Sequence, residues 1–205
     1  MTHTRGRPAR RAFSLIELLV VIAIIALILG ITIPTLSIAR AKAASTACGA
    51  KLYGIGQAIT IYRENNEGKH PEARYMPDPW LTGDTRQPIN EALRDYMEPY
   101  STAWVCPADR VVHSQTYDDN GTEKTCGVSY SYVTLLSAQA YEETFFARWL
   151  RFTPSDTPVM HDFDGGTFER EDGQTVRVDF FHPRRNILFV DGHVGHADST
   201  NTRND

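Results

Sequence analysis

The most prominent pattern in the chain is a run of apolar residues near its N-terminus. Residues 13–33 contain one charged side chain, Glu17, and are otherwise mostly aliphatic. As an α-helix, a run of this length would extend ~31 Å at ~1.5 Å per residue, which is about the thickness of the hydrocarbon core of a bilayer. The pattern therefore predicts a transmembrane helix over residues 13–33.

The helical pattern continues beyond the apolar run. Four apolar residues recur at a spacing of three or four positions, which predicts one apolar helix face: Leu52, Ile55, Ile59 and Tyr62. Pro34 lies between the two segments and predicts a kink. Gly54 and Gly56 should weaken the helix by about 1 kcal/mol each relative to Ala. The sequence thus predicts one long kinked helix over residues 13–63, with its first half in the membrane.

The remainder of the chain has shorter patterns. Helical spacing predicts helices at 88–97 and 138–150, and alternation or β-branched content predicts strands at 128–134, 159–162, 175–180, 186–190 and 193–196. Asp191 and Gly192 stand between the last two strands and predict a two-residue hairpin with a type I′ turn. The expected fold class is α+β, with a small antiparallel sheet packed on the long helix.

Charge is distributed unevenly along the chain. Residues 1–12 hold four arginines and no acidic residue, so the positive-inside rule leaves this leader in the cytoplasm and exports the rest. Without the leader arginines and Glu17, residues 34–205 hold 17 basic and 24 acidic residues, a net charge of −7. This acidic balance gives no support for a nucleic-acid partner.

Glu17 is unusual within the apolar run. An acidic side chain in a membrane helix costs about 2.5–3.5 kcal/mol at mid-helix and less near an end. Two interpretations fit the residues: a carboxylate that reaches the membrane interface, or a carboxylate that pairs with a cation supplied later, such as a new N-terminal amine.

Residues 12–22, AFSLIELLVVI, resemble the class III signal of type IV prepilins and pseudopilins. That signal consists of a short basic leader, a small residue, Phe-Thr/Ser-Leu-Ile-Glu and an apolar helix. The resemblance implies cleavage between Ala12 and Phe13 by prepilin peptidase, followed by N-methylation of Phe13; most relatives have Gly where Ala12 stands. It also implies that Glu17 of one subunit pairs with the Phe13 amine of the next subunit in a filament.

Two other targeting signals have to be weighed against this interpretation. Arg10 and Arg11 have the outline of a twin-arginine signal, and residues 41–43 offer an Ala-x-Ala site for ordinary signal peptidase. A secretory apolar region spans about 7–15 residues, which is shorter than the run seen here, and an acidic residue such as Glu17 is foreign to it. The prepilin interpretation is therefore favoured.

A second resemblance lies near the C-terminus. Residues 182–194, HPRRNILFVDGHV, resemble the signature of prepilin-type proteins in which nine residues separate a His from Asp-Gly; here eight residues separate His182 from Asp191 and Gly192. Residues 104–109, WVCPAD, are similar to the Cys-Pro-Ser-Asp patch of the same proteins. The resemblance implies no activity of its own. With no hydrolase, P-loop or dinucleotide-binding motif in the sequence, we expect the protein not to be an enzyme.

Acidic and histidine side chains near the C-terminus offer candidate metal ligands. Asp162 and Asp164 share a strand face, and Asp191 and His193 do so if the turn permits it. No spacing matches a known zinc or calcium motif, so no cofactor is expected. If a metal binds, calcium is favoured over zinc, because some pseudopilins hold calcium in a C-terminal loop.

The three cysteines lie on the exported side, where disulfides persist in many envelopes. A bond between Cys106 and Cys126 would close a 21-residue loop and contribute roughly 3 kcal/mol. Cys48 would then remain single. Pairing of Cys48 with either of the others, or three free thiols, stays open.

Together these patterns predict four parts: a cytoplasmic leader at 1–12, a transmembrane assembly helix at 13–33, its exported continuation at 34–63, and an exported pilin-like domain at 64–205. The expected function is that of a major or minor subunit of a type IV pilus-like or type II secretion pseudopilus-like filament. Its expected partners are prepilin peptidase/methylase, other pilin-like subunits and the inner membrane, with the assembled form in the periplasm or at the cell surface. The alternative is a membrane-anchored enzyme or metal-binding module with a pilin-type anchor.

Overall fold

The computed structural model describes residues 14–76, 79–80, 83–112, 114, 116–119, 121–125 and 127–198. The chain divides between Arg40 and Ala41 into two compact units, and each unit is described by itself below.

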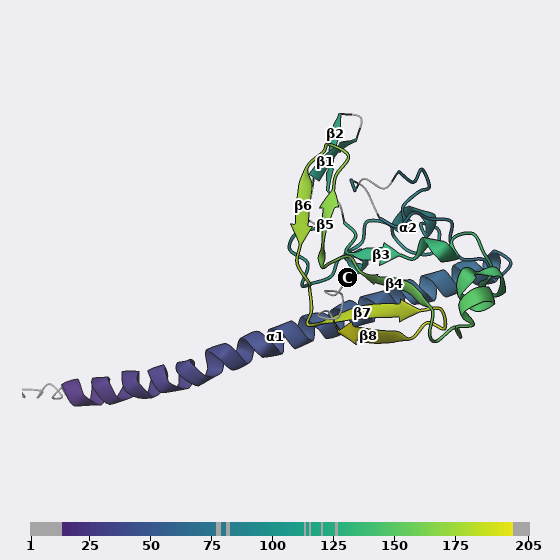
Figure 1. The fold of residues 1–205 in the computed structure, drawn as a ribbon. Coiled ribbons are helices and arrows are strands. Elements are labelled where there is room, and N and C mark those ends of the chain that lie inside the picture. Colours follow the sequence, from purple (N-terminus) through teal and green to yellow (C-terminus); the bar gives the residue numbers. More distant parts are fainter. Residues whose placement is uncertain are drawn as a thin grey trace, which may run out of the picture. The chain divides into compact units, whose positions relative to one another are not determined.

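Helix α1, Leu15–Asn65, is a single helix of 51 residues (Figure 1). Every described residue up to Arg40 is exposed. Among the described residues, α1 is the helix long and apolar enough to cross a membrane, and its most apolar 18-residue stretch has a mean hydropathy of 3.0. The predicted long helix is confirmed. Pro34 lies inside it without ending it, and the kink at Pro34 stays a prediction.

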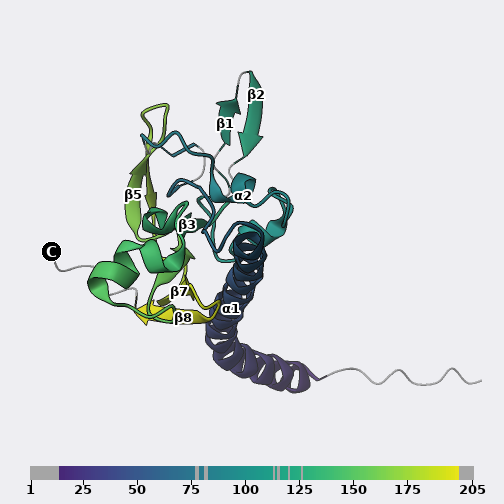
Figure 2. The ribbon, with the colours of Figure 1, turned by 90° about the vertical axis from the view of Figure 1, so that its right-hand side faces the viewer.

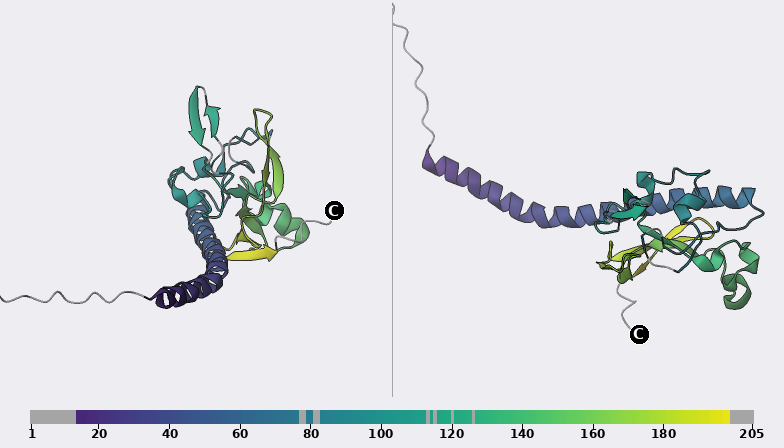
Figure 3. Two further views of the ribbon diagram at one scale, coloured as in Figure 1. Left: turned by 90° about the vertical axis from the view of Figure 1, so that its left-hand side faces the viewer. Right: turned by 90° about the horizontal axis from the view of Figure 1, so that it is seen from above.

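The second unit is built on a four-stranded antiparallel sheet in the order β3-β4-β7-β8. Its strands are β3 Tyr130–Tyr132, β4 Pro158–Asp162, β7 Arg184–Phe189 and β8 Val194–Asp198. The C-terminal part of α1 lies along this sheet, as Figure 3 shows from above. Buried residues of the helix and the sheet form one hydrophobic core that includes Cys48, Leu52, Ile55, Ile59, Tyr130, Met160 and Leu188. The α+β class with a helix packed on an antiparallel sheet is thus confirmed.

The register of the sheet shows which ends of β4 and β7 lie side by side. Tyr130 of β3 pairs with Asp162 of β4, and Pro158 at the other end of β4 pairs with Phe189 of β7. The start of β7 therefore lies near the end of β4, where Asp162 stands. The turn that follows β7 lies at the opposite end of the sheet.

Two further hairpins project away from this sheet (Figure 2). One joins β1 Thr116–Asp119 to β2 Thr122–Thr125, and the other joins β5 Gly166–Glu169 to β6 Thr175–Val178. A small second core lies beside the β5–β6 hairpin and contains Trp80, Val112, Phe163 and Val178. The short helical elements are α2 Ile89–Ala92, η1 Thr102–Trp104, η2 Thr134–Leu136, η3 Tyr141–Glu143 and η4 Phe146–Leu150.

The predicted helix over 138–150 is wrong as a single element. It is split into the 3-10 turn η3 and the π-helix η4. Thr144 separates them with an extended backbone, and its hydroxyl donates to Tyr141 O (2.7 Å) and accepts from Ala147 N (3.3 Å). Such local side-chain bonds compete with a continuous helical ladder.

The turn between β7 and β8 also differs from the prediction. Gly192 has a φ of +89°, whereas Asp191 is not in the left-handed region, so the turn is not type I′. Gly192 N donates to Phe189 O (2.9 Å), and Phe189 N donates to His193 O (3.0 Å), which closes a three-residue loop. The Asp191 carboxylate accepts from His193 N (3.1 Å) and stabilises this longer turn.

Candidate functional sites

The first site is the start of α1. Ser14 N donates to Glu17 Oε2 (2.9 Å), and Ile16 N donates to Ser14 Oγ (3.4 Å). Ser14 thus caps the helix by accepting from the backbone of the second residue of α1, and Glu17 reaches back to the backbone N–H of Ser14, as the glutamate of a capping box does. The spacing Ser-x-x-Glu is the sequence signal for this cap, which adds a second role to the pairing role expected of Glu17.

Glu17 is an exposed carboxylate within an apolar surface. It lines a shallow depression together with Ile16, Val20 and Val21. Its place in the first turn of α1 is electrostatically favourable because the helix dipole is positive at that end. Ala12 and Phe13, the residues on either side of the predicted cleavage, lie outside the described residues.

The second site is a buried polar centre between α1 and the sheet. Cys48 of α1 forms a disulfide with Cys106, and both residues are fully buried. The predicted Cys106–Cys126 bond is therefore wrong, because Cys106 is already bonded to Cys48; Cys126 lies outside the described residues. Lys51 holds the Cys106 segment on the helix by donating to Thr102 O (2.6 Å) and Val105 O (2.7 Å). This contact between distant segments explains the pairing, and sequence spacing does not reveal it.

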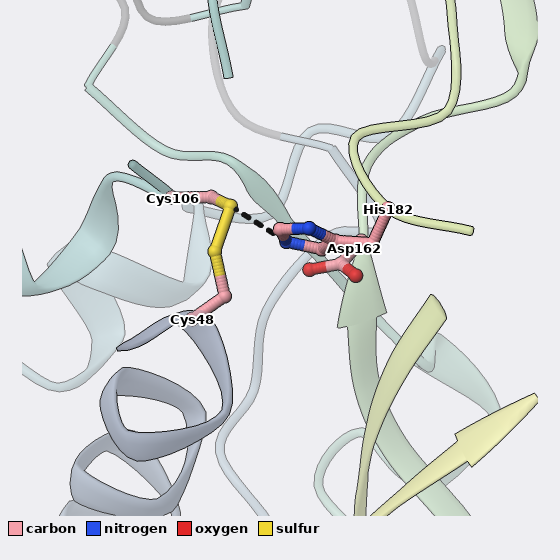
Figure 4. A group of neighbouring side chains, drawn as sticks. All are labelled: Cys48, Cys106, Asp162 and His182. Atoms are coloured by element: carbon pink, nitrogen blue, oxygen red, sulfur yellow. Dashed lines mark hydrogen bonds between the residues drawn. A yellow bond between two sulfur atoms is a disulfide. The ribbon is translucent and has the colours of Figure 1, made fainter. Parts of the chain in front are cut away.

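His182 lies against the disulfide. Its Nε2 is 3.2 Å from Cys106 Sγ, and the side chain is buried (Figure 4). Burial lowers the pKa of His182, and the charge of His196 lowers it further, so the imidazole is neutral near pH 7. The two segments that carry the second family resemblance, 104–109 and 182–194, thus meet at this contact.

Asp162, at the end of β4, lies in the same buried centre. Its Oδ2 accepts from Asn186 N (2.8 Å) and Asn186 Nδ2 (3.3 Å), while its Oδ1 is buried without a hydrogen-bond partner among the described residues. Burial raises the pKa of Asp162 to about 7, although the hydrogen bond from Asn186 N opposes the shift. The carboxyl group is thus poised between its neutral and charged forms near pH 7.

Asp164, two residues further on, is held differently. Its Oδ1 accepts from Arg185 Nε (2.8 Å) and its Oδ2 accepts from Phe181 N (2.9 Å). Burial raises the pKa of Asp164, and these bonds from Phe181 and Arg185 oppose the shift. The Arg185 guanidinium balances the buried charge.

The structure does not bring the four predicted metal ligands together. Asp162 and Asp164 lie at the end of β4, whereas Asp191 and His193 lie in the turn at the opposite end of β7. Asp191 Oδ1 and His193 Nδ1 are 2.6 Å apart and exposed. Among the described residues, the group with metal-ligand spacing is instead Cys48, Cys106, Asp162 and His182, whose donor atoms lie within 4.8 Å of one another.

The C-terminal signature is likewise not one site. His182 precedes β7 and lies at the disulfide, while Asp191 and Gly192 form the turn after β7. The patch at 104–109 contains a turn whose Trp104, Cys106 and Asp109 are buried, and Asp109 Oδ1 accepts from Val111 N (2.9 Å) and Val112 N (2.8 Å). In this structure both Asp109 and Asp191 stabilise turns.

Comparison with known proteins identifies the N-terminal segment. Residues 7–33 match the family model of the prokaryotic N-terminal methylation motif. No curated protein and no solved structure matches the chain. The chain thus carries a prepilin-type signal that leads into an apolar helix of membrane-spanning length. This combination supports a type IV pilin- or pseudopilin-type protein in general, and it fits a membrane-anchored protein.

Proposed function

We propose that this protein is a structural subunit of a type IV pilus-like or type II secretion pseudopilus-like filament. The observation that carries the proposal is the methylation motif at residues 7–33, which leads directly into a helix whose apolar side chains are exposed. The leader 1–12 is cytoplasmic and is removed by prepilin peptidase between Ala12 and Phe13. Residues 13–33 anchor the subunit in the inner membrane and later join the filament.

The exposed face of α1 supports assembly through this helix. Large aliphatic side chains such as Leu15, Leu27 and Ile38 are mostly exposed in the isolated chain, at 87%, 66% and 70%. Each such side chain gains about 1.5–3 kcal/mol when it is fully removed from water, so this helix is stable in a membrane or in a filament and not in water. Lipid tails cover this face in the membrane, and helices of neighbouring subunits cover it in the filament.

Glu17 gives the assembly its register. It is the only charged residue between Ser14 and Ala39. Cleavage before Phe13 creates an N-terminal amine, and N-methylation leaves it a cation. A carboxylate can accept several hydrogen bonds, so Glu17 can keep the bond from Ser14 N and also bind the Phe13 amine of a neighbouring subunit. Two charges that are costly alone in an apolar environment then compensate one another.

The exported part, 34–205, comprises the continuation of the helix at 34–63 and the pilin-like domain at 64–205. Its net charge of −7 faces away from the cytoplasm, in accordance with the four leader arginines that stay inside. The proposed partners are prepilin peptidase/methylase and other pilin-like subunits. The role is structural and needs neither catalytic residues nor a cofactor.

The test is filament incorporation of a Glu17→Gln variant. Gln keeps the size of the side chain and an amide oxygen for Ser14 N, and it removes only the charge. We expect normal membrane insertion and cleavage, but roughly tenfold less of the variant in the pelleted filament fraction, which corresponds to about 1.4 kcal/mol.

The matched control for this test is Ser14→Ala. It removes the bond between Ser14 Oγ and Ile16 N and keeps the Glu17 carboxylate. We expect incorporation close to that of the unmodified chain. Undiminished incorporation of Glu17→Gln contradicts the pairing of Glu17 with the neighbouring amine.

A further inference from the structure

The buried centre at the Cys48–Cys106 disulfide contains the donor atoms of a metal site. Two sulfur atoms, an imidazole nitrogen and a carboxylate oxygen lie within 4.8 Å of one another, and all four residues are buried. They come from α1, the segment after η1, the end of β4 and the segment before β7. Figure 4 shows His182 and Asp162 gathered on one side of the disulfide.

The donor set is one that zinc prefers. Zinc is bound tetrahedrally by thiolate, imidazole and carboxylate groups, with Zn–S bonds of ~2.3 Å, so two thiolates on one zinc ion lie ~3.8 Å apart. In the disulfide the two sulfur atoms are bonded to one another and are not available as thiolates. After reduction the two sulfur atoms are no longer bonded to one another, and rotation of the two cysteine side chains can separate them.

Asp162 supplies an independent sign of a missing ligand. Its carboxylate is fully buried, yet Oδ1 has no hydrogen-bond partner among the described residues. A buried polar atom without a partner costs about 1–3 kcal/mol. Asn186 holds the other oxygen, Oδ2, through two hydrogen bonds, as an outer-shell residue orients a metal-binding carboxylate.

We propose that Cys48, Cys106, Asp162 and His182 bind zinc in the reduced protein, and that zinc binding and disulfide formation are alternative states of this centre. A dithiol reductant gives two electrons and two protons to the disulfide and itself becomes a disulfide, leaving two cysteine thiols. Zinc then displaces the two thiol protons into solvent and binds the thiolates. Zinc links α1 to the sheet in a chain whose disulfide has not yet formed. This inference does not depend on the filament role.

Zinc stoichiometry of the full chain tests the proposal. The chain is purified in detergent in the presence of a phosphine, so that its cysteines remain reduced, and a second sample is fully oxidised. Both samples receive zinc chloride and are freed of unbound metal by gel filtration. We expect about one zinc ion per reduced chain and at least tenfold less per oxidised chain, with zinc released when the reduced sample is oxidised.

Variants locate the site. His182→Asn should lower zinc retention at least roughly tenfold, whereas His193→Asn, at an exposed His outside the cluster, should retain zinc as the unmodified chain does. Cobalt chloride gives a readout that needs no variant, because thiolate coordination in a tetrahedral site produces charge-transfer and visible absorption bands in the reduced chain. Equal zinc in the reduced and oxidised chains, or a reduced chain without cobalt–thiolate bands, overturns the proposal.

Discussion

Gly56 of α1 lies directly against Leu188 of β7: a Cβ atom at Gly56 would stand 2.7 Å from Leu188 Cδ1. The missing side chain allows the helix to approach the sheet closely, a role that the helix-weakening effect expected from the sequence does not reveal. Gly54, two residues earlier, has no atom within 4 Å of the position of such a Cβ. The two glycines of one helix thus have different roles.

This difference predicts opposite effects of two substitutions. Gly56→Val inserts a branched side chain into a filled space and should lower the free energy of unfolding by about 1–3 kcal/mol. Gly54→Ala should raise it by about 0.5–1 kcal/mol, because alanine loses less backbone entropy in a helix. Denaturant titrations of the full chain in detergent measure both. Equal effects at the two positions contradict the close contact between helix and sheet.

Because Cys48 and Cys106 form the disulfide, replacing one of them should reduce stability more than replacing Cys126. Cys106→Ser opens a link between residues 58 positions apart and should lower the free energy of unfolding by about 4 kcal/mol under oxidising conditions. Cys126→Ser keeps both bonded cysteines and serves as the control, with an expected change below about 1 kcal/mol. A loss of stability of equal size in Cys126→Ser supports the Cys106–Cys126 pairing instead.

Asp162 predicts a particular pH dependence of stability. Its pKa is about 7 in the folded protein and about 3.9 in the unfolded chain, so the folded protein binds more protons between these values. The contribution of Asp162 to stability is therefore fully present below pH ~4 and is lost as the pH rises through ~7. The amide introduced by Asp162→Asn does not titrate. We compare the free energy of unfolding of the unmodified chain with that of the Asp162→Asn variant. The difference, unmodified chain minus variant, should fall with rising pH by up to about 1.4 kcal/mol per pH unit.

Other titrating groups do not obscure this difference. Burial lowers the pKa of His70 to about 4, which favours folding as the pH rises from ~4 to ~6.5, but His70 is present in both chains and its effect cancels. A difference between the two chains that is constant from about pH 4 to about pH 7 shows that Asp162 is charged in the folded protein, and so contradicts the raised pKa.

Removing the arginine of a buried ion pair should cost more stability than removing the arginine of an exposed one. Arg185 pairs with Asp164, whose side chain has 0% exposure, whereas Arg177 pairs with Asp179 on the surface. Arg185→Met leaves a buried carboxylate without its partner and should cost about 3–5 kcal/mol. Arg177→Met should cost less than about 1 kcal/mol. Denaturant titrations measure both losses, and comparable values in the two variants contradict the burial of Asp164.

Helix α1 and the four strands of the main sheet follow from sequence because their patterns are local. The apolar spacing from Leu52 to Tyr62 and the alternation along β7 mark a helix and a strand without knowledge of their neighbours. The helix cap formed by Ser14 and Glu17 is equally local and could have been predicted from the Ser-x-x-Glu spacing. These features need only a few consecutive residues.

The buried centre depends on tertiary contacts that no local pattern encodes. Cys106 is brought to Cys48 by a segment that Lys51 anchors on the helix, and His182 reaches the pair from a third segment. The sequence marked Asp162 and His182 as residues of interest but associated Asp162 with Asp191 and His193. The register of β4 and β7 places that turn at the other end of the sheet.

The most direct test of the prepilin-type account is the mass of the mature N-terminus of the protein isolated from its native membrane. The account predicts a chain that begins at N-methylated Phe13. A chain that begins at Met1 indicates a simple anchor, a chain that begins at Ala44 indicates ordinary secretion, and either result contradicts the account.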